Sequence, residues 1–79
     1  MTNESKNVLR HLLSQGILNG FSLKRRTKLD TNSLIKALKP LIKDKFVTAS
    51  DFVFENTIDT IYFAPLARAA DLSAELVIE

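Results

Sequence analysis

The feature that most constrains the fold is a regular apolar repeat between residues 31 and 44. Leucine or isoleucine follows the period of an α-helix at Leu34, Ile35, Leu38, Leu41 and Ile42. At 100° per residue these side chains cover about 120° of a helical wheel. The opposite arc carries polar and basic residues, which are Asn32, Ser33, Lys36, Lys39, Pro40 and Lys43. The pattern predicts an amphipathic helix over residues 31–44 that buries its aliphatic side.

Pro40 conflicts with this helix, because it has no N–H to donate to the carbonyl of Lys36, and a proline inside a helix costs about 3 kcal/mol. A separate helical turn that begins at Pro40 is one alternative, since proline is favoured at the first helical position. The apolar repeat continues past the proline without a change of phase. We therefore expect a single helix, capped by Asp30 or Thr31, that bends at Pro40 around the core.

A shorter helix is expected over about residues 4–15. Its apolar side chains recur at helical spacing, at Val8, Leu9, Leu12 and Leu13. Asn3 or Ser5 can cap this helix by accepting a hydrogen bond from a free backbone N–H. Gly16 is expected to end it, because glycine tolerates the left-handed conformation of many helix C-termini.

A second short helix is expected over residues 22–28, after a loop or a short strand. Ser22 is expected to cap this helix, and Leu23 and Thr27 share the side that would face the core. Together with the helices over residues 4–15 and 31–44, this makes three expected helices in the first 44 residues.

The composition changes after Asp44. The segments FVTASDFVFE and IDTIYFA are rich in β-branched and aromatic residues, and ENT between them favours a turn. We therefore expect a β-hairpin over about residues 46–64. A surface that stacks on bases would need basic residues among its aromatic side chains. These neighbours are acidic, so we expect the aromatic side chains mainly in the core, namely Phe46, Phe52, Phe54, Tyr62 and Phe63.

A last helix is expected over about residues 65–77, with Pro65 in its first turn. Its apolar residues cover about 220° of the helical wheel, which is more than one packing partner requires. Part of this face is expected to pack on the core, and the remainder is a candidate seam for a homodimer. The residues assigned to the dimer seam are Leu66, Ala69, Leu72 and Leu76.

The composition argues against several classes of protein. The 79 residues include no cysteine and one histidine, His11, which has no carboxylate one turn away. The longest apolar run, residues 61–67, is much shorter than the roughly 20 residues that cross a bilayer. No glycine-rich phosphate loop and no calcium-loop spacing is present. We expect a single cytoplasmic domain, not an enzyme, with no cofactor, metal or membrane partner.

Charge is divided unevenly along the chain. Residues 1–48 hold ten basic and three acidic side chains, whereas residues 49–79 hold one basic and six acidic side chains. Eight of the eleven basic residues lie between residues 21 and 47. Such an asymmetry suggests an electrostatic partner for the basic part. The alternative is two solvated faces of opposite sign that mainly confer solubility.

The order helix, helix, helix, hairpin, helix resembles the winged helix-turn-helix family. That family often has the pattern Leu-Ala-x-x-Leu-Gly-Leu-Ser-x-Ser-x-Val-x-x-x-Leu, and LKRRTKLDTNSLIKAL at residues 23–38 is similar. The segments PLIKDKFVT and IYFAPLARA are similar to the family's entry into the wing and to its closing strand and helix. The resemblance implies a mainly α fold with a small β-hairpin: a three-helix bundle, a wing hairpin and a C-terminal helix.

Four positions depart from the family pattern. Lys24 replaces a small alanine and Thr27 replaces a leucine, while Lys28 and Lys45 stand where glycine commonly makes a tight turn. A lysine in a left-handed turn costs about 1 kcal/mol, which a domain can tolerate. The departures indicate a divergent member of the family, or a turn of another type.

The resemblance also implies a small, sequence-specific DNA-binding transcriptional regulator, with the helix over residues 31–44 in the major groove of duplex DNA. At the start of that helix, Asn32, Ser33 and Lys36 would contact base edges. The phosphates would be neutralised by Arg25, Arg26, Lys28, Lys39 and Lys43. Such a protein would associate with the nucleoid.

The expected hairpin argues against contact between a wing and DNA. It carries Asp51, Glu55 and Asp59 and no basic residue, and carboxylates near phosphates repel them. The alternative function is a winged-helix protein–protein interaction module that does not bind DNA. It would bind an acidic protein surface through the basic face, or a partner through the last helix.

Overall fold

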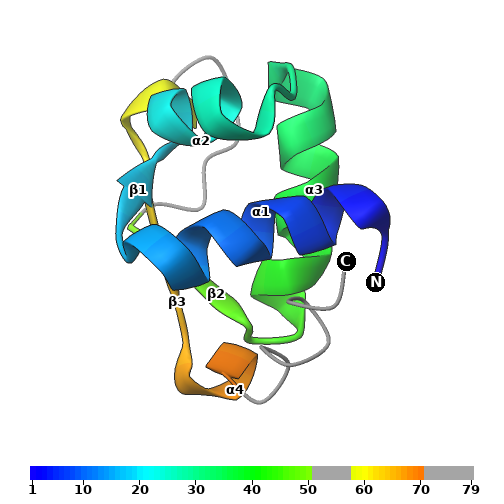
Figure 1. Cartoon of the computed structure of the whole chain (residues 1–79), viewed down its shortest axis with the longest axis vertical. Coiled ribbons are helices and arrows are strands. Elements are labelled where there is room, and N and C mark those ends of the chain that lie inside the picture. The colour runs from blue at the N-terminus through cyan, green and yellow to red at the C-terminus, as the bar shows by residue number, and fades with distance from the viewer. Residues whose placement is uncertain (51–57, 71–79) are drawn as a thin grey trace.

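The computed structural model describes residues 1–50 and 58–70 and is mainly helical, with a small antiparallel sheet (Figure 1). Its helices are α1 (Asn3–Gln15), α2 (Gly20–Thr27), α3 (Thr31–Lys43), the short 3-10 helix η1 (Ile58–Thr60) and α4 (Ala67–Ala70). Its strands are β1 (Leu18–Asn19), β2 (Val47–Ala49) and β3 (Tyr62–Pro65). The predicted fold class is confirmed, with a sheet of three strands rather than a two-stranded hairpin.

The sheet has the order β1-β3-β2, and β3 is antiparallel to both neighbours. Phe63 of β3 is opposite Leu18 of β1 on one side and opposite Ala49 of β2 on the other. The short strand considered between the first two helices is therefore β1. Residues 51–57 of the expected hairpin lie outside the described residues.

The second arm of the expected hairpin begins later than the sequence suggested, because residues 58–60 form η1 instead of a strand. Ile58 and Ile61 are both buried, and side chains three residues apart face the same way in a helical turn but opposite ways in a strand. The Ile61 N–H closes this turn by donating to the Ile58 carbonyl at 3.1 Å.

The core lies where α1 and α3 pack together and where the inner face of the sheet covers them (Figure 1). Its fully buried side chains include Val8, Leu9, Leu12, Leu23, Leu34, Leu38, Leu41, Val47, Ile58 and Phe63. Tyr62 was expected in the core but is 53% exposed, because Phe63 beside it faces inward and neighbouring residues of a strand face opposite ways. Phe46 is half-buried, and Phe52 and Phe54 lie outside the described residues.

The cap of α1 is Thr2, whose hydroxyl oxygen accepts a hydrogen bond from the Ser5 N–H at 3.1 Å. The expected caps, Asn3 and Ser5, are both inside the helix. Ser5 is unavailable because its side chain is buried and its hydroxyl donates to the Ala37 carbonyl of α3 at 2.9 Å. This hydrogen bond joins the first turn of α1 to the middle of α3.

The cap of α2 is Asn19, not the expected Ser22, which instead donates its N–H to Asn19 Oδ1 at 2.8 Å. The helix therefore begins two residues earlier than predicted, at Gly20. Gly20 is buried, and its N–H donates to the Ile61 carbonyl at 2.9 Å. A Cβ on Gly20 would lie 2.0 Å from the carbonyl oxygen of Ile58, so only glycine lets α2 start this close to η1.

The turns on either side of α3 use lysine where the family commonly uses glycine. Lys28, which ends α2, has φ 62°, and Lys45, which follows α3, has φ 63°. Both are left-handed, as the comparison with the family pattern suggested. Between these turns α3 runs through Pro40 as one helix, and the alternative of a separate helix at Pro40 is wrong.

Candidate nucleic-acid interface

One side of α3 is exposed along its whole length, and its side chains are polar or basic. We name this side the outer arc, and it consists of Asn32, Lys36, Lys39 and Lys43, all of them exposed. Their spacing of four, three and four residues places them within about 60° of each other around the helix. Leu34, Leu38 and Leu41 on the other side are fully buried. The helix therefore anchors itself through one side and presents the outer arc to solvent.

The start of α3 is fixed by Asp30, one of the two expected caps. Its Oδ1 accepts a hydrogen bond from the Ser33 N–H at 2.7 Å. The backbone and side-chain hydrogen bonds from Ser33 lower the pKa of Asp30, and the Lys36 ammonium lowers it further. Ser33, a predicted base contact, is half-buried beside this carboxylate, unlike the exposed residues of the outer arc.

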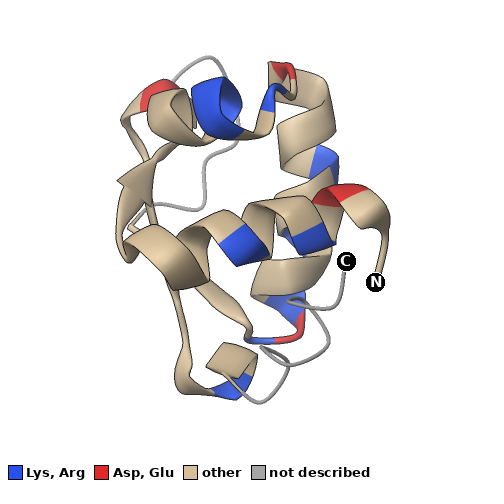
Figure 2. Cartoon of the chain, viewed as in Figure 1, with Lys and Arg blue, Asp and Glu red and all other residues tan. Residues whose placement is uncertain are grey.

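Basic segments lie on α2 and at several points along α3, and the start of α3 adjoins α2 (Figure 2). Arg25, Arg26 and Lys28, which were predicted to contact phosphates, are all exposed. Residues 31–43 contain no acidic side chain, and Asp30 and Asp44 lie just beyond the two ends of α3. Along α3 itself the basic surface therefore carries no carboxylate between the two ends of the helix, although Glu4 of α1 lines a hollow together with Lys36.

Lys24 joins three elements on this side of the molecule. Its Nζ lies 2.5 Å from Asp59 Oδ1 of η1 and donates to Thr31 Oγ1 of α3 at 3.2 Å. The lysine that replaces the family's alanine thus pairs with one of the three carboxylates that the sequence placed on the hairpin. Asp59 lies in η1 next to a lysine, so it offers no unbalanced negative charge to a polyanion. Asp51 and Glu55 lie outside the described residues.

Thr27 stands where the family pattern has a leucine, and its polar side chain is buried with a hydrogen-bond partner inside the chain. Thr27 is buried, and its Oγ1 donates to the Leu23 carbonyl at 2.6 Å, which satisfies the hydroxyl within α2. Asn7 Nδ2 of α1 donates to the Thr27 carbonyl at 3.3 Å. These contacts hold the end of α2 against α1 and so fix the direction in which the chain enters α3.

The arrangement of helices and strands matches solved structures over almost the whole chain. Lactococcus lactis ZitR in complex with DNA superposes with a TM-score of 0.78 at 19% identity, over 99% of this chain and 51% of that one. The AdcR repressor of Streptococcus pyogenes gives 0.77 at 22% identity, over 99% and 55% of the two chains. MarR from E. coli gives 0.76 at 19% identity, over 100% and 59%. The chain is a winged helix.

This winged helix spans between 51% and 59% of the length of those three structures. No protein-family model and no curated protein sequence matches the chain. The match in fold therefore extends well beyond any detectable match in sequence.

The start of the last helix of the winged helix differs from the prediction. Pro65 belongs to β3, where it is opposite Val47, and α4 begins at Ala67. Of the four residues assigned to a dimer seam, Leu66 is half-buried and Ala69 is fully buried in the chain's own core. Ala69 is therefore occupied within the molecule and offers no surface to a second copy. Leu72 and Leu76 lie outside the described residues.

Arg68 connects α4 to the end of α3. Its guanidinium donates to the Asp44 carbonyl at 2.7 Å and lies 4.7 Å from the centre of the Phe46 ring. Both contacts are within the fold, so Arg68 serves the structure of the winged helix rather than its basic surface.

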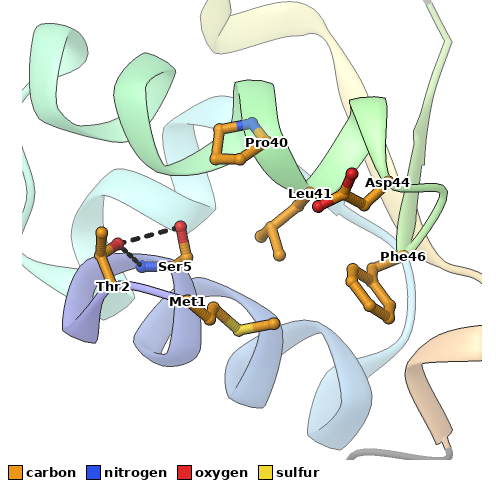
Figure 3. Close-up of a pocket in the computed structure, with 7 residues that line it drawn as sticks. All are labelled: Met1, Thr2, Ser5, Pro40, Leu41, Asp44 and Phe46. Atoms are coloured by element: carbon orange, nitrogen blue, oxygen red, sulfur yellow. Dashed lines mark hydrogen bonds between the residues drawn. The ribbon is translucent and has the colours of Figure 1, made fainter.

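A hollow of about 610 Å³ separates the start of α1 from the end of α3 (Figure 3). Its lining residues are Met1, Thr2, Ser5, Pro40, Leu41, Asp44 and Phe46. None of their side chains is basic, so this hollow is chemically distinct from the outer arc.

Phe21, in the first turn of α2, is a further exposed residue that was not among the predicted site residues. Its ring is 49% exposed, and the guanidinium carbon of Arg25 lies 5.7 Å from the ring centre. The signal available in the sequence was the spacing of four residues, which places Phe21 and Arg25 next to each other on a helix.

His11 is half-buried, with Nδ1 2.8 Å from the Asn7 carbonyl oxygen. Among residues 1–50 and 58–70, no three histidine, cysteine or acidic side chains lie close enough together to hold a metal ion. In the same residues, no helix has both the length and the apolar character needed to traverse a bilayer.

Proposed function

We propose that this winged helix binds duplex DNA as the DNA-binding part of a transcriptional regulator, with α3 in the major groove. The observation that carries the proposal is the outer arc, which projects three lysines and an asparagine from one side of a helix anchored in the core. An α-helix with its side chains is about 10–12 Å wide, and the major groove is about 12 Å wide. ZitR, which has the same fold, was solved in complex with DNA.

The length of α3 divides the outer arc into two roles. At 1.5 Å per residue, Lys43 lies about 16 Å along the axis from Asn32, so the two ends cannot both contact the same bases. Asn32 and Lys36, near the start of α3, are proposed to contact base edges, together with the less exposed Ser33. An asparagine can bond adenine through two hydrogen bonds, and a lysine can donate to guanine.

The remaining basic residues are proposed to contact the DNA backbone. They are Arg25, Arg26, Lys28, Lys39 and Lys43, and all five are exposed. Phosphate contacts supply affinity and orientation without sequence information. Sequence specificity therefore rests on the first two turns of α3.

The proposed regulator acts by occupying DNA, without catalysis, as a cytoplasmic protein at the nucleoid. A homodimer through residues 65–77 would place two copies of α3 on one site, as twofold-symmetric regulators do. Because Ala69 is buried within the chain, the seam would consist of Leu66, Leu72 and Leu76. Light scattering of the wild type and of Leu72→Glu tests this point, since a monomer in both cases removes the dimer.

A salt titration of binding to a random duplex tests the proposed function. Neutralisation of about four to six phosphates predicts that log K falls against log salt with a slope of roughly −4 to −5. Absence of binding at 50 mM salt would refute the proposal and would favour the interaction module that binds an acidic protein surface.

Lys36→Glu tests whether the outer arc makes the contact. Because Lys36 is exposed, we expect much weaker duplex binding with the free energy of unfolding changed by less than about 0.5 kcal/mol. Lys6→Glu is the matched control, since it changes the charge equally on α1, which packs against α3 through its own buried side. Equal losses of affinity in the two variants would exclude α3 as the specific contact.

A further inference from the structure

Phe21 and Arg25 form an exposed pair on α2. About half of the Phe21 surface is open to solvent, although burial of a phenylalanine is strongly favoured. The Arg25 guanidinium carbon is 5.7 Å from the ring centre, within the roughly 6 Å range of a cation–π contact. The pair is four residues apart, so the ring lies one helical turn before the guanidinium and limits where it can move.

Arg25 also borders a polar hollow of about 340 Å³ that is lined by Ser22, Arg25 and Arg26. Two guanidinium groups and a hydroxyl can all donate hydrogen bonds, and none of the described residues that line the hollow carries a carboxylate. Within the described residues, neither guanidinium donates a hydrogen bond or forms an ion pair. Arg68, by contrast, donates to a backbone carbonyl. The donors of Arg25 and Arg26 are therefore available to an anion from outside the chain.

The position of this hollow relates it to the outer arc. Phe21 and Arg25 border a second, shallow hollow together with Asp30 and Thr31, which lie immediately before Asn32. The hollow of Ser22, Arg25 and Arg26 therefore lies beside the end of α3 that is proposed to contact bases. A duplex held by that end would bring its sugar-phosphate backbone, not its base edges, next to α2.

We propose that Ser22, Arg25 and Arg26 form a binding site, the phosphate seat, for one phosphate of the DNA backbone, and that Phe21 positions the Arg25 side chain in it. This proposal rests on the proposed function. The two arginines and the Ser22 hydroxyl donate to the phosphate oxygens, and guanidinium groups match phosphate geometry with paired N–H donors. Arginine loses rotamer freedom when it binds. The Phe21 ring reduces that loss because it already holds the Arg25 side chain beside the seat.

The test is a double-mutant cycle on duplex affinity, with Phe21→Ala, Arg25→Ala and the double variant measured across a salt series. Loss of the exposed cation–π contact predicts a Kd that rises about two- to fivefold in Phe21→Ala. Arg25→Ala should reduce the steepness of the salt dependence by about 0.9, as expected for one lost phosphate contact. In the Arg25→Ala background, Phe21→Ala should have no further effect. Phe21→Tyr keeps the ring and should restore wild-type affinity.

Tyr62→Ala is the control, because Tyr62 is an aromatic residue of similar exposure (53%) on β3. Its affinity should equal that of the wild type. The positioning role is overturned if Phe21→Ala binds like Tyr62→Ala, or if Phe21→Ala weakens binding equally with and without Arg25. In both cases the wild type still binds DNA, so the proposed function survives. A wild type that does not bind DNA overturns both proposals together.

Discussion

Replacement of Gly20 by alanine is expected to destabilise the winged helix, because the added methyl group has no room. A Cβ at this position would lie 2.0 Å from the carbonyl oxygen of Ile58 and 2.8 Å from its carbon. These are backbone atoms, so relief requires α2 and η1 to separate until the closest contact reaches about 3.0 Å. That movement would also strain the 2.9 Å hydrogen bond from the Gly20 N–H to the Ile61 carbonyl.

The expected loss follows from opposing effects. Overpacking of a well-packed site costs about 1–3 kcal/mol and a weakened hydrogen bond about 1 kcal/mol, whereas alanine favours a helix over glycine by up to about 1 kcal/mol. The net loss of about 2 kcal/mol corresponds to a Tm lower by roughly 8–16 °C for a domain of this size. Thermal and urea unfolding followed by circular dichroism measure it.

The control for Gly20→Ala is Asn3→Ala, which also places alanine at the first residue of a helix but at an exposed position of α1. It should change the free energy of unfolding by less than about 0.5 kcal/mol. If Gly20→Ala is as stable as Asn3→Ala, the close approach of α2 to η1 is refuted, and with it our explanation of where α2 begins.

Three further predictions concern α1 and α3. Ser5→Ala removes the buried hydrogen bond to the Ala37 carbonyl and should cost about 1–2 kcal/mol in urea unfolding; an unchanged midpoint would contradict that bond. The pKa of Asp30 is lowered from its ordinary value of 3.8 in the folded chain. Its carboxylate therefore stabilises the fold at pH values above 3.8, and this stabilisation is lost as the pH falls through the lowered pKa of the folded state. The stability difference between wild type and Asp30→Asn should therefore be constant from pH 5 to 7 and shrink below pH 4; a difference independent of pH would refute the assignment. Pro40→Ala restores an N–H inside α3 and should stabilise the chain by up to about 3 kcal/mol, whereas lower stability would show that α3 depends on the proline.

The elements that the sequence predicted well are those determined by local repetition. The apolar repeat of α3 alone defines which side is buried, so the outer arc followed from the same pattern. Lys28 and Lys45 were matched to positions that commonly carry glycine, and both have the left-handed conformation that such turns need. In each case the information lies within one or two turns of the chain.

The features that the sequence did not predict depend on contacts between distant residues. Several polar residues near the start of α1 can serve as a cap, and the choice of Thr2 follows from the bond of Ser5 to α3. The helical turn η1 follows from the burial of Ile58 together with Ile61. The ion pair of Lys24 with Asp59 brings together residues 35 positions apart, which no local pattern reveals.

The central place of β3 in the sheet has a consequence for how the molecule is made. Among residues 1–50 and 58–70, strands β1 and β2 hydrogen-bond to β3 but not to each other, so in this part of the chain neither has a sheet partner until residues 62–65 have been added. A growing polypeptide can form α1, α2 and α3 early, because their contacts are mostly local. Closure of this sheet must wait for β3, and a fragment that stops before Tyr62 would leave the edges of β1 and β2 that pair with β3 open to self-association.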